Sequence, residues 1–301
     1  MSYYITTDAT CDLIKDYYDE NFGVIPMDFT IKGETFNTES RPMDYKEFYD
    51  LVRQGEMPTT AQVTAYTATE FLTPILEKGY DVYHIAFSSA LSGTYDSAII
   101  AQKELQEKFP DRKIYVIDSL NASMGEGLLV YHALQKRKEG ASIEELDEYL
   151  KDLIGRLCSY FTVDDLKHLV RTGRISKIAG SVGSALKLKP VLYVNDNGRL
   201  INIDKVMGRK KAILGVFNHM QEKFVPCKEN EVIAISDGDA PDVDELIARI
   251  KEAYPSIKTI IRTPIGPAIG SHSGPQTIAV FFVGKDKLEK KDPEVNGRIA
   301  E

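Results

Sequence analysis

The first half of the chain alternates short apolar runs with longer segments in which apolar residues recur at helical spacing. The apolar runs have the length of buried strands, and we expect strands at residues 3–7, 24–29, 82–87 and 113–117. Helical spacing predicts helices at residues 44–54, 67–78, 93–108, 123–138 and 143–156. Strands that alternate with helices predict an α/β domain with a mostly parallel sheet and flanking helices, in which ligand loops lie at the strand ends.

The second half is richer in strands than the first. Apolar runs predict six strands, at residues 160–163, 190–194, 200–206, 232–236, 259–262 and 278–283. Asn195-Asp196-Asn197-Gly198 predicts a hairpin turn between the second and third of these strands, and two helices are expected at residues 209–224 and 242–253. We therefore expect an N-terminal α/β domain at 1–160, a C-terminal α+β domain on a largely antiparallel six-stranded sheet at 161–284, and a charged, loosely ordered tail at 285–301.

Polar residues mark where several of these helices begin. Ser142 is followed three positions later by Glu145, and Thr67 by Glu70, and both spacings are typical of a capping box. Ser92 directly precedes the helix expected at 93–108 and is its predicted N-cap.

Composition and charge narrow the class of protein. Of the 301 residues, 43% are hydrophobic and 27% are charged, as in ordinary globular proteins. The chain shows neither a signal-peptide pattern nor an apolar run near the ~20 residues of a membrane span, so we expect a cytoplasmic protein without stable membrane insertion. The formal net charge of −8 argues against nucleic acid as a partner.

The three cysteines, Cys11, Cys158 and Cys227, are too few and too widely spaced for a disulfide framework or a metal site. We expect reduced thiols, with Cys11 buried and inert. The chain also lacks a phosphate-binding Gly-x-x-x-x-Gly-Lys loop and a metal-binding carboxylate cluster, so neither a cofactor nor a metal is expected.

One histidine stands in an unusual loop near the C-terminus. His272 lies in Ile265-Gly-Pro-Ala-Ile-Gly-Ser-His-Ser-Gly-Pro275, where three glycines and two prolines predict a sharply bent, non-helical segment. A side chain that exchanges a proton near neutral pH is thereby placed on a shaped loop. The alternative is a tight turn that carries a surface histidine without a role.

Two further polar loops have the same character. Ser88-Ser89-Ala90-Leu91-Ser92-Gly93-Thr94-Tyr95 joins a predicted strand to a predicted helix, and the free backbone N–H groups of such a junction favour an anion. Pro58-Thr59-Thr60-Ala61-Gln62-Val63-Thr64 offers hydroxyl groups and an amide without charge. The alternative for the first loop is helix capping alone, and the alternative for the second is an ordinary hydroxyl-rich turn.

These loops, taken in order with other short motifs, resemble the DegV family of bacterial fatty-acid-binding proteins. The matching pieces cover nearly the whole chain. They are Ile5-Thr-Thr-Asp-Ala-Thr-Cys-Asp-Leu13, the loops around Thr60, Ser92 and His272, Leu169-Val-Arg-Thr-Gly-Arg-Ile-Ser176, Leu188-Lys-Pro-Val-Leu192 and Gly208-Arg-Lys-Lys-Ala212. The chain departs from the family pattern at Ala61 and Val63, where Ser and Pro are usual, and at Thr172, where a second glycine is usual.

The resemblance implies a carrier for a long-chain fatty acid. Its carboxylate would bind Thr60, Ser92, Gly93, Thr94 and His272, with secondary contacts from Gln62, Ser88 and Ser89. The alkyl tail needs a buried apolar tunnel. Candidates for its lining are Phe29, Ile31, Phe71 and Leu91, with ordinary core packing as the alternative for each.

The resemblance also implies partners. A separate ATP-dependent kinase subunit would convert the bound carboxylate to an acyl phosphate, which passes to an acyltransferase of phospholipid synthesis. Arg171 and Arg174, outside the carboxylate contacts, would meet the transferred phosphoryl group or the kinase surface. The alternative is that they cap helix ends or pair with surface carboxylates. The chain itself would not be a complete catalyst.

Two other function classes remain at this point. Ser92 and His272 are the residues that a stand-alone serine hydrolase would use, although no Gly-x-Ser-x-Gly elbow accompanies them. A small polar pocket around His272 would instead indicate a triose-like ligand.

Overall fold

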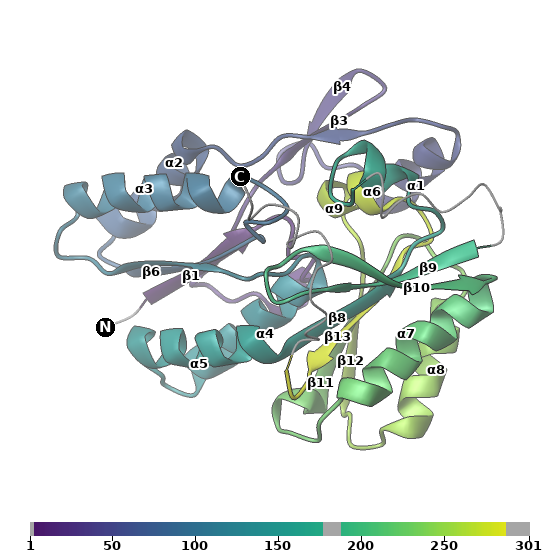
Figure 1. Cartoon of the computed structure of the whole chain (residues 1–301). Coiled ribbons are helices and arrows are strands. Elements are labelled where there is room, and N and C mark those ends of the chain that lie inside the picture. Colours follow the sequence, from purple (N-terminus) through teal and green to yellow (C-terminus); the bar gives the residue numbers. More distant parts are fainter. Residues whose placement is uncertain (1–2, 177–187, 287–301) are drawn as a thin grey trace, which may run out of the picture.

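The computed structural model describes residues 3–176 and 188–286, and its first sheet is parallel throughout. Its strands stand in the order β2 (Phe22–Ile25), β1 (Tyr3–Asp8), β6 (Asp81–Ala86) and β7 (Ile114–Asp118). Helices α2 (Ala65–Glu77) and α3 (Thr94–Lys108) cover one face, and α4 (Met124–Lys138) and α5 (Ile143–Arg156) lie on the other (Figure 1). The predicted α/β arrangement is confirmed.

The second sheet has six strands, and only one of its pairings is parallel. The order is β10 (Leu200–Met207), β9 (Leu188–Val194), β8 (Leu157–Thr162), β13 (Ile278–Val283), β11 (Val232–Asp237) and β12 (Thr259–Pro264), with β11 and β12 parallel. Helices α7 (Arg209–Lys223) and α8 (Val243–Ala253) cover one face. The six predicted strands and the hairpin turn between β9 and β10 are confirmed, and the boundary expected at residue 160 falls inside β8.

Helix α4 lies between the two larger sheets. It packs on β1 and β6 of the first sheet and on β8, β11 and β13 of the second. One apolar cluster accordingly contains Ile5 and Ile85 from the first sheet, Leu128 from α4, and Phe161 and Phe281 from the second sheet. The two sheets therefore share a core through this helix.

A small third sheet was not expected from the sequence. It consists of β3 (Asp28–Ile31), β4 (Glu34–Asn37) and β5 (Thr59–Thr60) and packs with helix α1 (Tyr45–Arg53). The single strand expected at 24–29 is wrong, because the chain leaves the first sheet at Ile25 and enters the third at Asp28. Pro26 between them has no N–H to donate to a ladder, which explains the break.

The histidine segment is helical, contrary to the expected non-helical loop. Helix α9 spans Pro267–Ser273, with Gly266 as N-cap and Gly274 as C-cap at φ 77°. Proline is favoured at the first helical position, where no N–H is needed, and glycine is favoured just past the last. These residues therefore bound a short helix instead of preventing one. The structure also adds α6 (Lys167–Arg171), which was not predicted.

Helix caps agree with the sequence in one case and shift in two. Ser142 and Glu145 form the predicted capping box of α5. The N-cap of α2 is Thr64, which accepts from the N–H of Thr67, so the predicted box at Thr67 is three residues too late. Gly93 is the N-cap of α3, although the Ser92 hydroxyl accepts from the N–H of Thr94.

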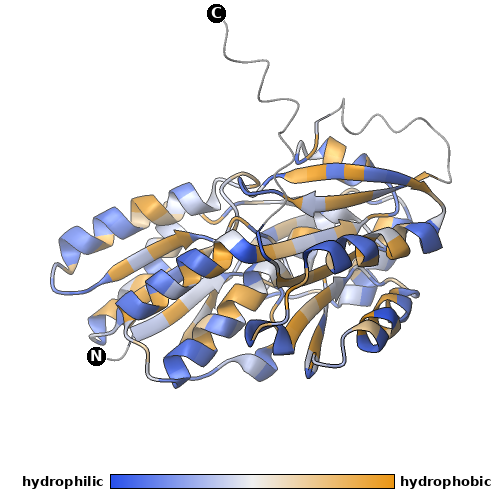
Figure 2. Cartoon of the chain, turned by 60° about the horizontal axis from the view of Figure 1, so that its bottom comes forward, coloured by the Kyte–Doolittle hydropathy of each residue, from blue (hydrophilic) through white to orange (hydrophobic). Residues whose placement is uncertain are grey.

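Hydropathy follows this layering. In Figure 2 the helices nearest the viewer are mostly blue, whereas the strands behind them carry long orange stretches. No helix in the described part of the chain has both the length and the apolar character that a membrane crossing requires. The tail predicted at 285–301 lies outside the described residues from position 287 onward.

Candidate functional site

A cavity of about 210 Å³ lies between the two larger sheets. Thr10 follows β1 and Phe87 follows β6, so the carboxyl ends of the parallel strands form one wall. Phe161 of β8 and Ala279 of β13 are paired across the second sheet and form part of the facing wall. The site is thus built by residues from both halves of the chain.

Most of the cavity wall is apolar. The apolar lining residues are Met27, Phe87, Leu91, Ala122, Phe161, Leu169, Val194, Leu200, Ile265, Ala268, Ile269, Ala279 and Phe281. Such a wall suits an alkyl chain, because each methylene removed from water contributes about 0.8 kcal/mol. It disfavours the triose-like alternative, which needs a small polar pocket.

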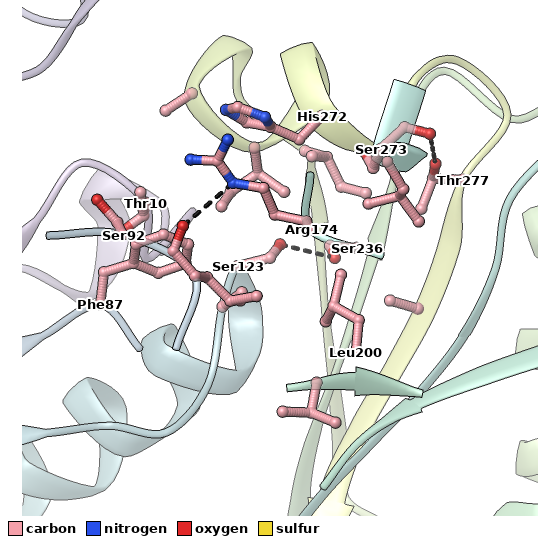
Figure 3. Close-up of a pocket in the computed structure, with 18 of the residues that line it drawn as sticks. Thr10, Phe87, Ser92, Ser123, Arg174, Leu200, Ser236, His272, Ser273 and Thr277 are labelled. Carbon is pink, nitrogen blue, oxygen red and sulfur yellow. Dashed lines mark hydrogen bonds between the residues drawn. The ribbon is translucent and has the colours of Figure 1, made fainter. Parts of the chain in front are cut away.

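Polar groups from four separate segments line this cavity. Thr60 Oγ1 lies 2.8 Å from His272 Nε2, although the two residues are 212 positions apart. Arg174 and Ser92 line the same cavity, and Figure 3 shows the Arg174 guanidinium between His272 and Ser92 in that view. The hydrogen bond of His272 goes to Thr60, while Ser92 Oγ lies 3.0 Å from Thr94 Oγ1, so the pairing that a serine hydrolase needs is not formed here.

His272 is neutral in this setting. Burial, and then the neighbouring charges of Arg174 and Arg171, lower the pKa of His272 to about 3. Its Nδ1 atom is buried without a hydrogen-bond partner among the described residues. The positive charge available to an anion in the cavity is therefore that of Arg174, and His272 contributes a neutral hydrogen-bonding edge.

The two arginines, expected to act together, have different places in the structure. Arg171 ends α6, and its guanidinium donates to the carbonyl oxygens of Pro58 (2.8 Å) and Ser271 (3.2 Å), so it ties two loops together. Arg174 lines the cavity, where its Nε donates to the carbonyl oxygen of Leu91 at 3.1 Å. The turn after α6, at Gly173 with φ 74°, brings it there.

The remaining predicted contacts divide into two groups. Gln62 and Gly93 line the cavity with Thr60, Ser92 and His272. Thr94, Ser88 and Ser89 do not line it. The Thr94 hydroxyl accepts from the N–H of Val63, the Ser88 hydroxyl donates to the carbonyl oxygen of Gly198, and Ser89 is exposed.

Of the four residues considered for the tunnel lining, one lines this cavity and three pack in apolar cores. Leu91 lines the cavity, but Phe29 and Ile31 pack in the core beside α1. Phe71 of α2 packs against the cores formed with β2, β6 and α3. Those three side chains belong to satellite cores, since aromatic and branched residues at regular spacing serve packing as readily as a cavity.

Sequence reasoning missed a group of hydroxyl residues on the cavity wall. Ser123, Ser236 and Ser273 line it, together with Ser159 and Thr277. Ser123 directly precedes α4 and has a positive φ of 52°, which a non-glycine residue rarely adopts. Ser123 follows the strand predicted at 113–117 and therefore lies at the same edge of the sheet as Ser92. This position in the sequence was the signal that could have identified Ser123.

Three carboxyl groups lie behind this wall. Burial raises the pKa of Asp8 to about 7 and that of Asp12 to about 7, and it raises the pKa of Glu126 well above its usual range. Thr7 Oγ1 lies 2.8 Å from the carbonyl oxygen of Ile85 and 2.7 Å from Glu126 Oε1. A hydroxyl has one hydrogen, so both contacts are hydrogen bonds when Glu126 is protonated and donates to Thr7.

Cys11 is buried, as expected, and burial raises the pKa of its thiol well above the usual value. Within residues 3–176 and 188–286, no group of three or more His, Cys, Asp or Glu side chains is arranged to hold a metal ion.

Known proteins resemble this chain over almost its full length. The family model described as uncharacterised protein, DegV family, matches residues 2–285. A DegV domain-containing protein of Clostridium perfringens is 41% identical over 288 residues, covering 94% of this chain and 98% of the relative. A solved structure from Thermus thermophilus, described as fatty acid binding of a DegV family protein, has 27% identity and a TM-score of 0.82, covering 94% of this chain and 100% of that one.

A further solved structure, with lower sequence identity, shows a shared fold alone. The fatty acid kinase (Fak) B3 protein of Streptococcus pneumoniae, solved with linoleic acid, has a TM-score of 0.83 at 21% identity. It covers 94% of this chain and 99% of that one.

Proposed function

The chain belongs to the DegV family, and from this premise we propose that it binds one long-chain fatty acid in the cavity between its two larger sheets. The observation that carries the proposal is the combination of an apolar wall with one arginine, Arg174, beside the Thr60–His272 pair. A fatty acid has the same two parts, an alkyl tail and a single negative charge. The Thermus thermophilus relative, described as fatty-acid-binding, supports the same ligand class.

The carboxylate is assigned to the polar part of the cavity. Arg174 supplies the charge, and the hydroxyl groups of Thr60 and Ser92 supply uncharged donors. Neutral His272 donates or accepts without adding a second buried charge. Gln62 lines the cavity and is also exposed, so the polar end of the cavity opens to solvent. The alkyl tail then extends away from that end, toward Phe161 and Leu200.

The proposed role of the bound acid is to serve a partner kinase. An oxygen of the carboxylate attacks the γ-phosphorus of ATP on a separate kinase subunit, ADP leaves, and an acyl phosphate forms for a downstream acyltransferase. The open end of the cavity is where such a subunit would reach the carboxylate. The support for this role is the shared fold of the Streptococcus pneumoniae fatty acid kinase (Fak) B3 protein.

Binding is tested with delipidated protein, oleic acid and methyl oleate. Native mass spectrometry is expected to show one oleic acid per chain. Arg174→Ala is expected to weaken oleic acid binding by about 10- to 100-fold, since hydrogen bonds to charged groups contribute roughly 1.5–3 kcal/mol. Methyl oleate, which has no charge, is expected to bind the variant and the parent alike.

Arg199→Ala is the matched control, because Arg199 is exposed on the β9–β10 hairpin and does not line the cavity. Absence of any bound lipid would overturn the proposal, and equal affinity of parent and Arg174→Ala for oleic acid would move the carboxylate elsewhere. Acyl-phosphate formation from the loaded protein, ATP and a cognate kinase subunit tests the second step separately.

A further inference from the structure

The proposed carboxylate site leaves part of the polar wall unexplained. Ser123, Ser236, Ser273 and Thr277 line the cavity and are here called the serine patch. Each of them is at least nine-tenths buried, with exposed fractions of 4%, 0%, 7% and 2%. An alkyl chain makes no hydrogen bond to such groups, and buried polar groups without partners cost free energy.

Sheet register places these residues together. Ser236 of β11 stands opposite Ala279 of β13, and Thr277 directly precedes β13 and lines the same cavity. The Thr277 hydroxyl donates toward the carbonyl oxygens of Gly274 (2.9 Å) and Ser273 (3.2 Å), which holds the end of α9 beside it. Ser123 Oγ lies 2.9 Å from Ser236 Oγ, and Figure 3 shows this contact within the cavity.

Ser236, which lines the cavity, keeps an unused hydrogen-bonding position in either arrangement of protons. Ser123 Oγ lies 2.5 Å from Asp12 Oδ2. If Ser123 donates to Asp12, Ser236 must donate to Ser123, and the lone pairs of Ser236 remain free. If Asp12 donates to Ser123, Ser123 donates to Ser236, and the hydrogen of Ser236 remains free.

Ser273 provides the second, independent observation. Its Oγ atom is buried and lines the cavity, yet it has no hydrogen-bond partner among residues 3–176 and 188–286. It therefore offers both a donor and an acceptor to whatever lies in front of it. Ser271, two residues earlier on α9, is different, because its hydroxyl donates to the carbonyl oxygen of Pro267 at 2.7 Å.

We propose that the serine patch binds an oxygen substituent on the acyl chain, so that the preferred ligand is an oxygenated fatty acid. A hydroxyl group on the acyl chain can both donate and accept a hydrogen bond, as the free position of Ser236 and the unpartnered hydroxyl of Ser273 require. This inference rests on the proposed fatty-acid binding and names a narrower class of ligand for the same cavity.

The test compares stearic acid with 2-, 3-, 10- and 12-hydroxystearic acid on the delipidated full chain by calorimetry. At least one hydroxy acid is expected to bind roughly tenfold more tightly than stearic acid, the effect of one additional buried hydrogen bond. Ser273→Ala and Ser236→Ala are each expected to reduce this preference and to leave the affinity for stearic acid within about twofold.

Ser271→Ala is the control, as a buried serine of the same helix that does not line the cavity, and it is expected to retain the preference. If stearic acid binds and no hydroxy acid binds more tightly, this inference is overturned and the fatty-acid proposal remains intact. A preference that survives in both Ser273→Ala and Ser236→Ala would also overturn it. Failure of stearic acid itself to bind would instead contradict the proposed function.

Discussion

At the residue scale, Glu126 illustrates how neighbouring groups determine a protonation state. The side chain is fully buried, and Thr7 and Thr10 contact its two carboxyl oxygens at 2.7 and 2.8 Å. Thr7 already has an acceptor in the carbonyl oxygen of Ile85. A protonated Glu126 that donates to Thr7 and accepts from Thr10 satisfies all these groups, in agreement with its raised pKa.

Glu126→Gln tests this state, because glutamine has one donor and one acceptor end, as a protonated carboxyl group does. The carboxyl group of Glu126 has a higher pKa in the folded chain than in the unfolded chain, where it is about 4.3. Its contribution to the free energy of unfolding is therefore complete below that unfolded value and is lost as the pH rises through the folded value. The free energy of unfolding of the variant is therefore expected to rise relative to the parent between pH 5 and pH 8. Urea denaturation at the two pH values measures it.

Glu77→Gln removes the same charge at an exposed position of α2 and serves as the control. A difference between Glu126→Gln and the parent that is unchanged from pH 5 to pH 8 would show that Glu126 is ionised in the fold.

At the element scale, α9 is the helix that builds the site. Its first residue is Pro267, Gly274 ends it in a left-handed conformation, and His272 lies in its last turn. A side chain at Gly274 would also lie 2.5 Å from His168 Cδ2. At Gly270 a Cβ atom would lie 2.6 Å from Tyr49 Oη. Helix α9 therefore lies so close to α1 that a residue larger than glycine at position 270 would clash with Tyr49.

Gly270→Ala is expected to destabilise the protein by about 1–3 kcal/mol through overpacking, because Tyr49 is fully buried and its hydroxyl donates to Ile265. Gly155→Ala is the matched control. Gly155 lies near the end of α5 with nothing within 4 Å of a Cβ atom, so its substitution is expected to stabilise by about 0.5–1 kcal/mol. Thermal unfolding of the two variants measures both effects, and destabilisation of similar size at both positions would contradict the packing argument.

At the scale of the whole molecule, the cavity couples the two larger sheets. Its wall contains residues that follow β1 and β6 and residues of β8 and β13, and α4 packs between the sheets. A ligand in the cavity therefore contacts both halves of the chain and binds only when they are assembled. Ligand binding must then add to the stability of the entire fold.

Oleic acid is accordingly expected to raise the free energy of unfolding, by about 2.7 kcal/mol at 100 times its dissociation constant. Chemical denaturation of delipidated protein at increasing oleic acid concentration measures this. Dihydroxyacetone at the same concentrations is expected to have no effect, since the wall is mostly apolar. Stabilisation by dihydroxyacetone without stabilisation by oleic acid would indicate a small polar ligand.

The sequence alone determined most elements of the two larger sheets. Strands such as β6 and β13 follow from uninterrupted apolar runs, and α5 follows from helical spacing together with the Ser142–Glu145 box. These signals lie within a few residues of one another, so they can be read without knowledge of the fold. The ordered family motifs likewise indicated Thr60, Ser92 and His272, which do line one cavity.

Only the tertiary structure decided which of the polar residues line the cavity. Thr94 and Ser88 have the same kind of hydroxyl as Ser92, but Val63 and Gly198, distant in sequence, engage theirs. Arg174 enters the cavity while Arg171 binds Pro58 and Ser271. Such outcomes depend on partners up to 212 positions away, as in Thr60 and His272. Burial and hydrogen-bond partners come from residues that only the assembled sheets bring together, and local spacing carries no information about them.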